Sequence, residues 1–348
     1  MIMKRLLLST VILLFSLGLA AQTLGEFKPS DNSFGLGKLK KAPKRIYISK
    51  FDVNYEVYKT AQDFKQGGSM LGGGVRGDAT SKLAVGLLGV QHEDLIRITD
   101  ELYSDFKGML ESKGITIISA EQAGSAKAYE DWELIKGGEI NKSQLPGILT
   151  VSPTGYSYYV KRVNKKGEQK TGLINNYAAL SRDLDDAIIA DVSLTVMFTR
   201  DGNNVIDLNQ AKVKVNTDFR LIDTYTVTAI KEKAIMKGAN SYDVVQSSVA
   251  FYHGKVGLGS TTTYSGSMKK PLQIEGVIKE DKIVSVTKQA SSTTAVSNGV
   301  MSFYTADNRE GSETSAIEVD SKLYASGALM ACKQMIEYHT KNFLENID

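Results

Sequence analysis

The 348-residue sequence has only one cysteine, Cys332, along with three histidines, five prolines and one tryptophan. A single thiol excludes an internal disulfide, and so few histidines leave little material for a zinc site. The histidines, His92, His253 and His339, stand in separate segments with no second ligand at metal spacing. Cys332 and His339 fall on the apolar face of a helical pattern, which predicts a buried inert thiol and a core histidine. We therefore expect no metal and no cofactor.

Long apolar runs are lacking after the N-terminus, so no transmembrane helix is predicted there. Within residues 1–21, Lys4 and Arg5 precede an apolar run from Leu6 to Leu19, and small residues end at Ala21. This order predicts a secretory signal peptide cleaved after Ala21. A retained N-terminal anchor is the alternative, but the run is shorter than the roughly 20 residues that span a bilayer. We expect an exported protein of the periplasm, outer membrane or cell surface, without a lipid anchor because no cysteine lies near the cleavage site.

The sequence also lacks a strong excess of charge of one sign. Its 42 basic and 39 acidic residues give a net charge of +3, which falls to +1 when Lys4 and Arg5 are removed. A near-neutral surface has no electrostatic footprint for nucleic acid. A local basic cluster favours a solvated hairpin end over a binding patch; it comprises Lys161, Arg162, Lys165, Lys166 and Lys170.

Motifs of catalysis are lacking as well. No G-x-S-x-G nucleophile elbow occurs, and the glycine run 72–77 lacks the Lys-Ser/Thr pair of a phosphate loop. The segment 201–212 departs from a calcium loop at several ligand positions. The acidic cluster of Asp183, Asp185 and Asp186 has the residue types for acid/base work, but its helix-to-strand position favours solvated charges and caps. We expect no catalytic residues and a non-enzymatic protein; an enzyme without a visible motif is a further possibility.

The patterns that are present predict an α/β (α+β) fold: a mixed β-sheet flanked by helices, with an additional β-rich hairpin region and a long C-terminal helix. After an extended or loosely packed N-terminal segment (22–43), we expect one domain, 44–348, with a β-rich insertion around 240–310. Apolar periodicity predicts the elements that follow. They are strands at 45–53, 115–118 and 187–198; helices at 95–111, 121–134 and 320–347; an alternating strand 212–222 continuing as a meander into 227–234; and a hairpin at 274–286. The glycine-rich segment 67–90 is expected to be a flexible loop, or else a lumen-facing or membrane-touching one.

The order of these elements resembles the family of CsgG, the outer-membrane secretion channel for curli fibres. The strand 45–53, the helix 95–111 with its following strand, the strand around 190–194 and the segment 212–224 are similar to elements of that family, and 328–344 is similar to its closing helix. The sequence departs from the family in lacking a lipid-bearing cysteine, in carrying Tyr225 where the family turns on glycine, and in the β-rich stretch 240–310.

The resemblance implies a periplasmic α/β body and ring-forming oligomers and, in channel members, amphipathic hairpins that join between subunits. Candidate hairpins are 153–175 and 245–268, although weak alternation favours soluble sheet edges for both. We expect a CsgG-like secretion or assembly component of the cell envelope that forms an oligomer at the outer membrane, through self-association or with other envelope proteins. The alternative is a soluble periplasmic or surface module that binds a small molecule or glycan through the tyrosine-rich segment 152–160 and the glycine-rich loop.

Overall fold

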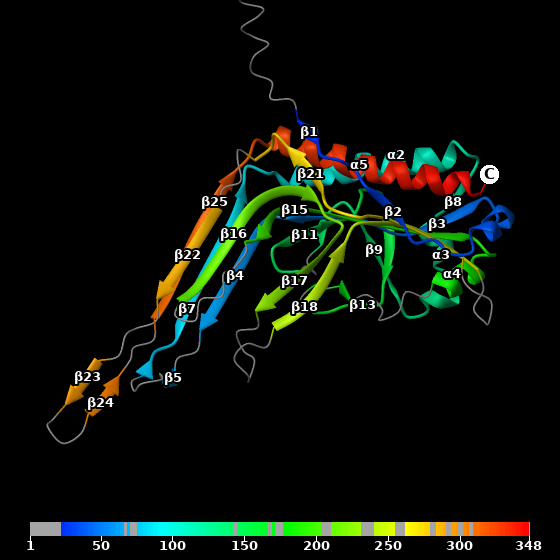
Figure 1. Ribbon diagram of the computed structural model, residues 1–348. Helices are drawn as coiled ribbons and strands as arrows, with labels where there is room; N and C mark the ends of the chain where they lie inside the picture. Colours follow the sequence, from blue (N-terminus) through cyan, green and yellow to red (C-terminus); the bar gives the residue numbers. More distant parts are fainter. Residues whose placement is uncertain are drawn as a thin grey trace, which may run out of the picture.

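The computed structural model shows a body built on one large mixed sheet, from which a group of long strands projects (Figure 1). It describes residues 22–65, 68–69, 75–141, 145–165, 167, 169–170, 177–202, 210–230, 240–254, 262–278, 283–289, 294–297, 302–305 and 309–347. The predicted signal peptide, residues 1–21, lies outside this range. The mixed α/β architecture confirms the predicted fold class.

Two long strands, β3 (Arg45–Glu56) and β15 (Ile188–Asp201), run parallel at the centre of the sheet. On the side of β3, the sheet continues through β8 (Thr116–Ile118), β11 (Ile148–Val151) and β10 (Ile140–Asn141). The opposite side of β15 pairs with β19 (Ser248–His253) and β16 (Gln210–Leu221). β20 (Thr262–Met268) joins β19, and β21 (Leu272–Glu275) joins β16.

One face of this sheet is covered by α2 (His92–Glu111) and α5 (Ser321–Glu345), which lie side by side in Figure 1. The apolar face of α2 is buried, with Leu95, Ile98, Leu102, Phe106 and Leu110 in the core. Asp320 caps α5 by accepting hydrogen bonds from the backbone N–H groups of Lys322 and Leu323. Beneath the helices, β3 and β15 bury the apolar residues that face them, and Phe343 of α5 stacks on Phe251 with ring centroids 3.6 Å apart. The predicted helices 95–111 and 320–347 and the predicted strands 45–53 and 187–198 are confirmed.

The second face of the sheet carries two small apolar clusters. The first, around Tyr47 and Ile189, packs against α4 (Tyr177–Asp183), α3 (Ala120–Ala123) and the 3-10 turn η2 (Lys127–Tyr129). The second, around Met197 and Ile222, packs against the hairpin of β17 (Thr224–Ile230) and β18 (Asn240–Gln246). The strands β9 (Glu133–Lys136), β12 (Ser157–Val160), β13 (Arg162–Val163) and β14 (Gln169–Lys170) lie beyond this face. A polar strip separates the two clusters.

The projecting part, which we call the strand arm, has two layers. One layer is a three-stranded sheet in the order β25 (Arg309–Glu318), β7 (Ala79–Leu88), β4 (Tyr58–Lys65). The other is the first half of β16 paired with β22 (Ile283–Gln289). Small apolar residues of both layers are buried between them, including Val85 and Val213. Ser81 Oγ bridges the layers by donating to the carbonyl of Ala211 at 2.7 Å. Toward its end lie β5 (Gly68–Ser69), β6 (Val75–Arg76), β23 (Thr294–Ser297) and β24 (Ser302–Thr305).

Four sequence predictions are wrong. The expected loop 67–90 contains β7, and a regular hairpin of β4 and β7 replaces it over the described residues. The expected helix 121–134 is only one turn, α3, which ends at its C-cap Gly124 and is followed by η2, and residues 133–136 are the strand β9 because they pair with β12. The hairpin 274–286 does not form either: β21 and β22 each pair with β16, one after the other along it.

The meander expected after 212–222 is also absent from the described strands, because β17 pairs with β18 and not with β16. Strands within 240–310 are present, and β19, β20 and β21 belong to the central sheet. The candidate hairpin 245–268 therefore supplies two strands of the body, β19 and β20, which pair with each other.

The N-terminal segment 22–43 is extended and packs along the sheet. β1 (Thr23–Leu24) pairs with β21, and β2 (Pro29–Asp31) pairs with β20. The 3-10 turn η1 (Leu36–Lys41) then buries Leu39 completely. Among the helices of the described residues, none combines the length and the apolar character that crossing a bilayer requires.

Candidate functional site

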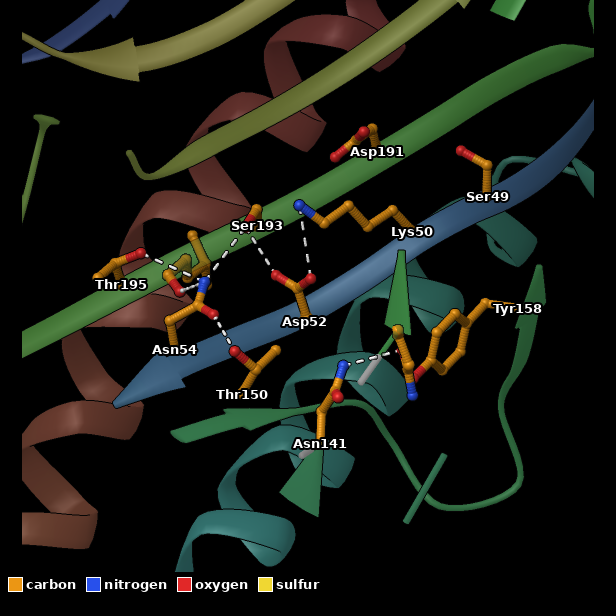
Figure 2. A network of polar contacts seen from close by, with 12 residues as sticks. Ser49, Lys50, Asp52, Asn54, Asn141, Thr150, Tyr158, Asp191, Ser193 and Thr195 are labelled. Atoms are coloured by element: carbon orange, nitrogen blue, oxygen red, sulfur yellow. Dashed lines mark hydrogen bonds and ion pairs between the residues drawn. The ribbon is translucent and has the colours of Figure 1, made fainter. Parts of the chain in front are cut away.

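The polar strip on the second face comes from alternate residues of the two central strands. Lys50, Asp52 and Asn54 project from β3, and Asp191, Ser193 and Thr195 project from the neighbouring β15 (Figure 2). In β3 the intervening residues, such as Phe51 and Val53, are buried under the helices. Because successive side chains of a strand point to opposite faces of the sheet, β3 contributes apolar residues to the core and polar residues to the strip.

A β-bulge at Ser49 positions Lys50. Ala190 is aligned with Ile48, whereas Asp191 is aligned with Lys50, so Ser49 is an extra residue in β3. Ser49 Oγ donates a hydrogen bond to the carbonyl of Ala190 at 3.0 Å. Because of the bulge, two consecutive side chains, Ser49 and Lys50, line the same pocket. Bulges of this kind often redirect side chains beside functional sites.

The strip is held by a continuous set of hydrogen bonds. Ser193 Oγ donates to Asp52 Oδ1 at 2.6 Å, and Lys50 Nζ lies 3.5 Å from Asp52 Oδ2. Asn54 Nδ2 donates to the carbonyl of Leu194 at 3.1 Å, while Asn54 Oδ1 accepts from Thr150 Oγ1 at 2.7 Å. These contacts fix the side chains of β3 relative to β15 and β11.

The strip contains one ammonium group, that of Lys50, and two carboxyl groups, those of Asp52 and Asp191. The Asp52 carboxylate, and to a smaller degree Asp191, raise the pKa of Lys50, so it stays protonated at neutral pH. Burial raises the pKa of the Asp191 carboxyl, and Lys50 and the hydroxyl of Tyr177, which donates to Asp191, oppose that shift. Each charged group of this cluster has a partner.

Aromatic and amide side chains form the opposite wall. Tyr158 Oη and Asn141 Nδ2 both donate hydrogen bonds to Gln169 Oε1, at 3.0 and 2.9 Å. These two bonds connect the strands β12, β10 and β14. Tyr129 stacks on Tyr159 with ring centroids 4.2 Å apart, and Trp132 packs next to Tyr129. Between this wall and the strip lies a cavity of about 210 Å³, which we call the Lys50 pocket. The pocket combines aromatic surface with a few fixed polar groups, which is the usual make-up of a small-molecule site.

Sequence reasoning found part of this pocket. Tyr156, Tyr158 and Tyr159, from the predicted tyrosine-rich recognition segment, all line it. The described residues of the glycine-rich segment lie instead in the strand arm. Lys50 and Asp52 were missed, although their alternation with Phe51 and Val53 was a signal; the bulge that brings Lys50 onto this face has no sequence signature.

The other residues singled out by sequence have structural roles. His339 is fully buried, as predicted: Tyr264 Oη donates to its Nδ1 at 2.9 Å and its Nε2–H donates to the carbonyl of Ser267 at 2.9 Å. Cys332 is buried, and burial raises the pKa of its thiol. Asp183 accepts a hydrogen bond from the backbone of Ala128, and Asp185 pairs with Arg45. No group of three or more His, Cys, Asp or Glu side chains in the described part of the chain is placed to hold a metal ion.

A second candidate surface is the strand arm. In its three-stranded sheet, β4 and β25 are the outer strands, with no strand paired to their far edges among the described residues. Exposed small or polar side chains lie along them, Thr60 on β4 and Ser312, Thr314 and Ala316 on β25. An outer strand offers backbone N–H and C=O groups for pairing with another chain.

Comparison with protein-family models, with curated proteins and with solved structures gives no match to this chain.

Proposed function

We propose that this chain is a non-enzymatic, exported component of a cell-envelope assembly, CsgG-like in its organisation, whose copies associate side by side through the strand arm. The observation that carries the proposal is the arm itself: a strand projection from an α/β body, with an outer strand on each side. The N-terminal pattern of residues 4–21 supports export, to the periplasm or the outer membrane.

The occupant of the arm's edges that we propose is a second copy of the same chain. β4 and β25 are different strands, so pairing the β4 edge of one copy with the β25 edge of the next repeats from copy to copy. Such a head-to-tail interface gives a closed ring if the rotation between copies closes, and an open filament if it does not. Pairing would also protect both edges from non-specific aggregation.

The register of the arm allows a direct test by disulfide formation. Thr60 and Thr314 are both aligned with Ala84 of β7 and so lie two strand spacings apart within one chain. That distance is about 9–10 Å, and a disulfide requires Cα atoms within about 7 Å. A bond between cysteines at these positions therefore reports contact between copies. The native Cys332 is buried and does not compete.

The experiment combines Thr60→Cys in turn with Ser312→Cys, Thr314→Cys and Ala316→Cys in the protein without residues 1–21. We expect at least one combination to give a ladder of covalent multimers on oxidation, and multi-angle light scattering to show an oligomer before oxidation. Thr60→Cys with Ser112→Cys, an exposed position at the end of α2, is the matched control. A monomer by scattering with no ladder in any combination would exclude the proposed association.

A further inference from the structure

The Lys50 pocket has the charge balance of a site for an uncharged ligand. Of the described side chains that line it, only Lys50 and Asp52 carry a charge, and they form an ion pair with Nζ 3.5 Å from Oδ2. Asp52 also accepts from Ser193, while Asp191, outside the lining, accepts from Tyr177. The Asp52 carboxylate beside Lys50 offsets the attraction of the ammonium group for an anion. An ion pair can nevertheless exchange hydrogen bonds with hydroxyl groups, because a hydroxyl both donates and accepts.

The opposite wall is lined by tyrosine rings and amide groups. Tyr156 and Tyr158 lie nearly parallel, with an interplanar angle of 15°, and Tyr129 and Tyr159 form the second stack. Tyr158 also bonds Gln169, so the ring is fixed in direction. Aromatic rings offer apolar faces, and tyrosine adds a polar edge. The cavity, about 210 Å³, is smaller than the roughly 300–1,000 Å³ of pockets for drug-sized molecules.

We propose that the Lys50 pocket binds one neutral sugar residue, either a free monosaccharide or one unit of a longer glycan. The ring of the sugar would lie against the tyrosine faces, and its hydroxyl groups would exchange hydrogen bonds with Asp52, Lys50 and the amides of Asn141 and Gln169. This site goes beyond the proposed association, because it lies on the body and needs no contact between copies.

The chain carries its own reporter for this site. Trp132 is the only tryptophan, and it lines the pocket. We expect its emission to change saturably when D-glucose or N-acetyl-D-glucosamine is added to the protein, with an affinity that salt does not alter, since no net charge is exchanged. Cellohexaose and chitohexaose distinguish a glycan chain from a free monosaccharide as the ligand. Tighter binding of a hexamer than of its monosaccharide indicates a glycan chain, and equal affinity per sugar unit indicates a free monosaccharide.

Neighbouring residues of β14 give a matched pair of variants. Gln169→Ala removes the amide that bonds both Asn141 and Tyr158, and we expect about tenfold weaker binding. Lys170→Ala changes an exposed residue outside the pocket lining and should leave the affinity unchanged. Thermal unfolding tests whether both variants are folded, and Asn141→Ala replaces Gln169→Ala if the latter does not fold.

Three results would overturn the proposal. The first is no change in Trp132 emission with any neutral sugar. The second is tighter binding of glucuronate or of glucosamine than of glucose, which would indicate a charge-selective site. The third is an equal loss of affinity in Gln169→Ala and Lys170→Ala. Each of these binding measurements can be made on the monomeric protein, so they remain valid if the strand arm does not associate.

Discussion

Single buried polar residues stabilise this protein where two elements meet, and His339 is the first example. Both ring nitrogens are occupied, one by Tyr264 on β20 and one by the Ser267 carbonyl. Burial lowers the pKa of His339, so the neutral ring is the folded form. The contact is tight: a Cβ on Gly266 would lie 2.3 Å from the ring.

We therefore expect stability to fall as the pH drops through 6.5, the ordinary pKa of histidine, because the unfolded chain then binds a proton that the folded chain resists. Denaturant unfolding at several pH values measures this effect, and His339→Gln should flatten the profile in that range.

Gly266→Ala should lower the free energy of unfolding by about 1–3 kcal/mol, because the added carbon overpacks the ring of His339. Gly108→Ala, in open space on α2, should not destabilise and serves as the control.

Glu56 gives the second residue-scale prediction. Its carboxyl group is buried and accepts hydrogen bonds from the backbone of Phe198 and Thr199, at 3.0 and 2.9 Å, and from Thr199 Oγ1 at 2.8 Å. Burial raises its pKa, and Lys59 and these hydrogen bonds oppose the rise. The folded chain then holds this proton more tightly than the unfolded chain, so this contribution to stability falls as the pH rises above 4.5, its ordinary pKa.

The variant Glu56→Gln keeps an acceptor for the two N–H groups and offers a donor to Thr199, but carries no charge. We expect it to remove the decline in stability above the ordinary glutamate pKa. Glu56→Ala should instead lose about 1–3 kcal/mol, since buried N–H groups are left without a partner. Chemical denaturation across the pH range compares the three proteins. A parallel pH profile for the wild type and Glu56→Gln would contradict this role for the carboxylate.

At the scale of elements, Gly147 controls how the strand arm leaves the body. It has a φ of 78°, and its carbonyl accepts from the N–H groups of Val57 and Tyr58, at 2.9 and 3.2 Å. A Cβ there would lie 1.7 Å from the carbonyl oxygen of Tyr58. The turn before β11 and the start of β4 are therefore in direct backbone contact.

Gly147→Ala should destabilise the protein by more than about 1–3 kcal/mol, because strain of the backbone adds to the collision. We expect the amides of β4 to lose protection from hydrogen exchange before those of β15. Gly155→Ala is the matched control: Gly155 has a φ of 73° but no neighbouring atom within 4 Å of the added carbon. Equal losses in the two variants would show that backbone conformation alone accounts for the effect.

The elements that sequence predicted well are those with long, regular patterns. The apolar stripes of α2 and α5 and the alternation of β16 are local properties, and they appear as expected. The pairing partners of a strand are not a local property. β25 is polar and pairs with β7, more than two hundred residues away, so its own composition does not predict a strand. The sequence indicated only the tyrosines of the Lys50 pocket, because the polar strip that faces them depends on the pairing of β3 with β15.

At the scale of the whole molecule, the N-terminal segment 22–43 fastens the outer strands of the body. β2 extends the sheet beyond β20, and Leu39 of η1 is fully buried in the main core. We expect Leu39→Ala to lower the free energy of unfolding by about 2–5 kcal/mol, with β20 among the strands that lose protection from hydrogen exchange. Leu36→Ala, at a partly buried position of the same turn, should cost less. A small effect at Leu39 would show that this segment is not part of the cooperative fold.

The bulge in β3 also limits which lengths of this strand are compatible with the fold. Deleting a residue within a strand normally reverses the facing of every side chain beyond it, so Phe51 and Val53 would exchange places with Asp52 and Asn54. Only the loss of Ser49 or Lys50 restores simple alternation and leaves all remaining residues facing as before. Over evolutionary time this strand can therefore lose one residue only at the bulge. Such a loss would preserve the core but change which polar side chains line the second face.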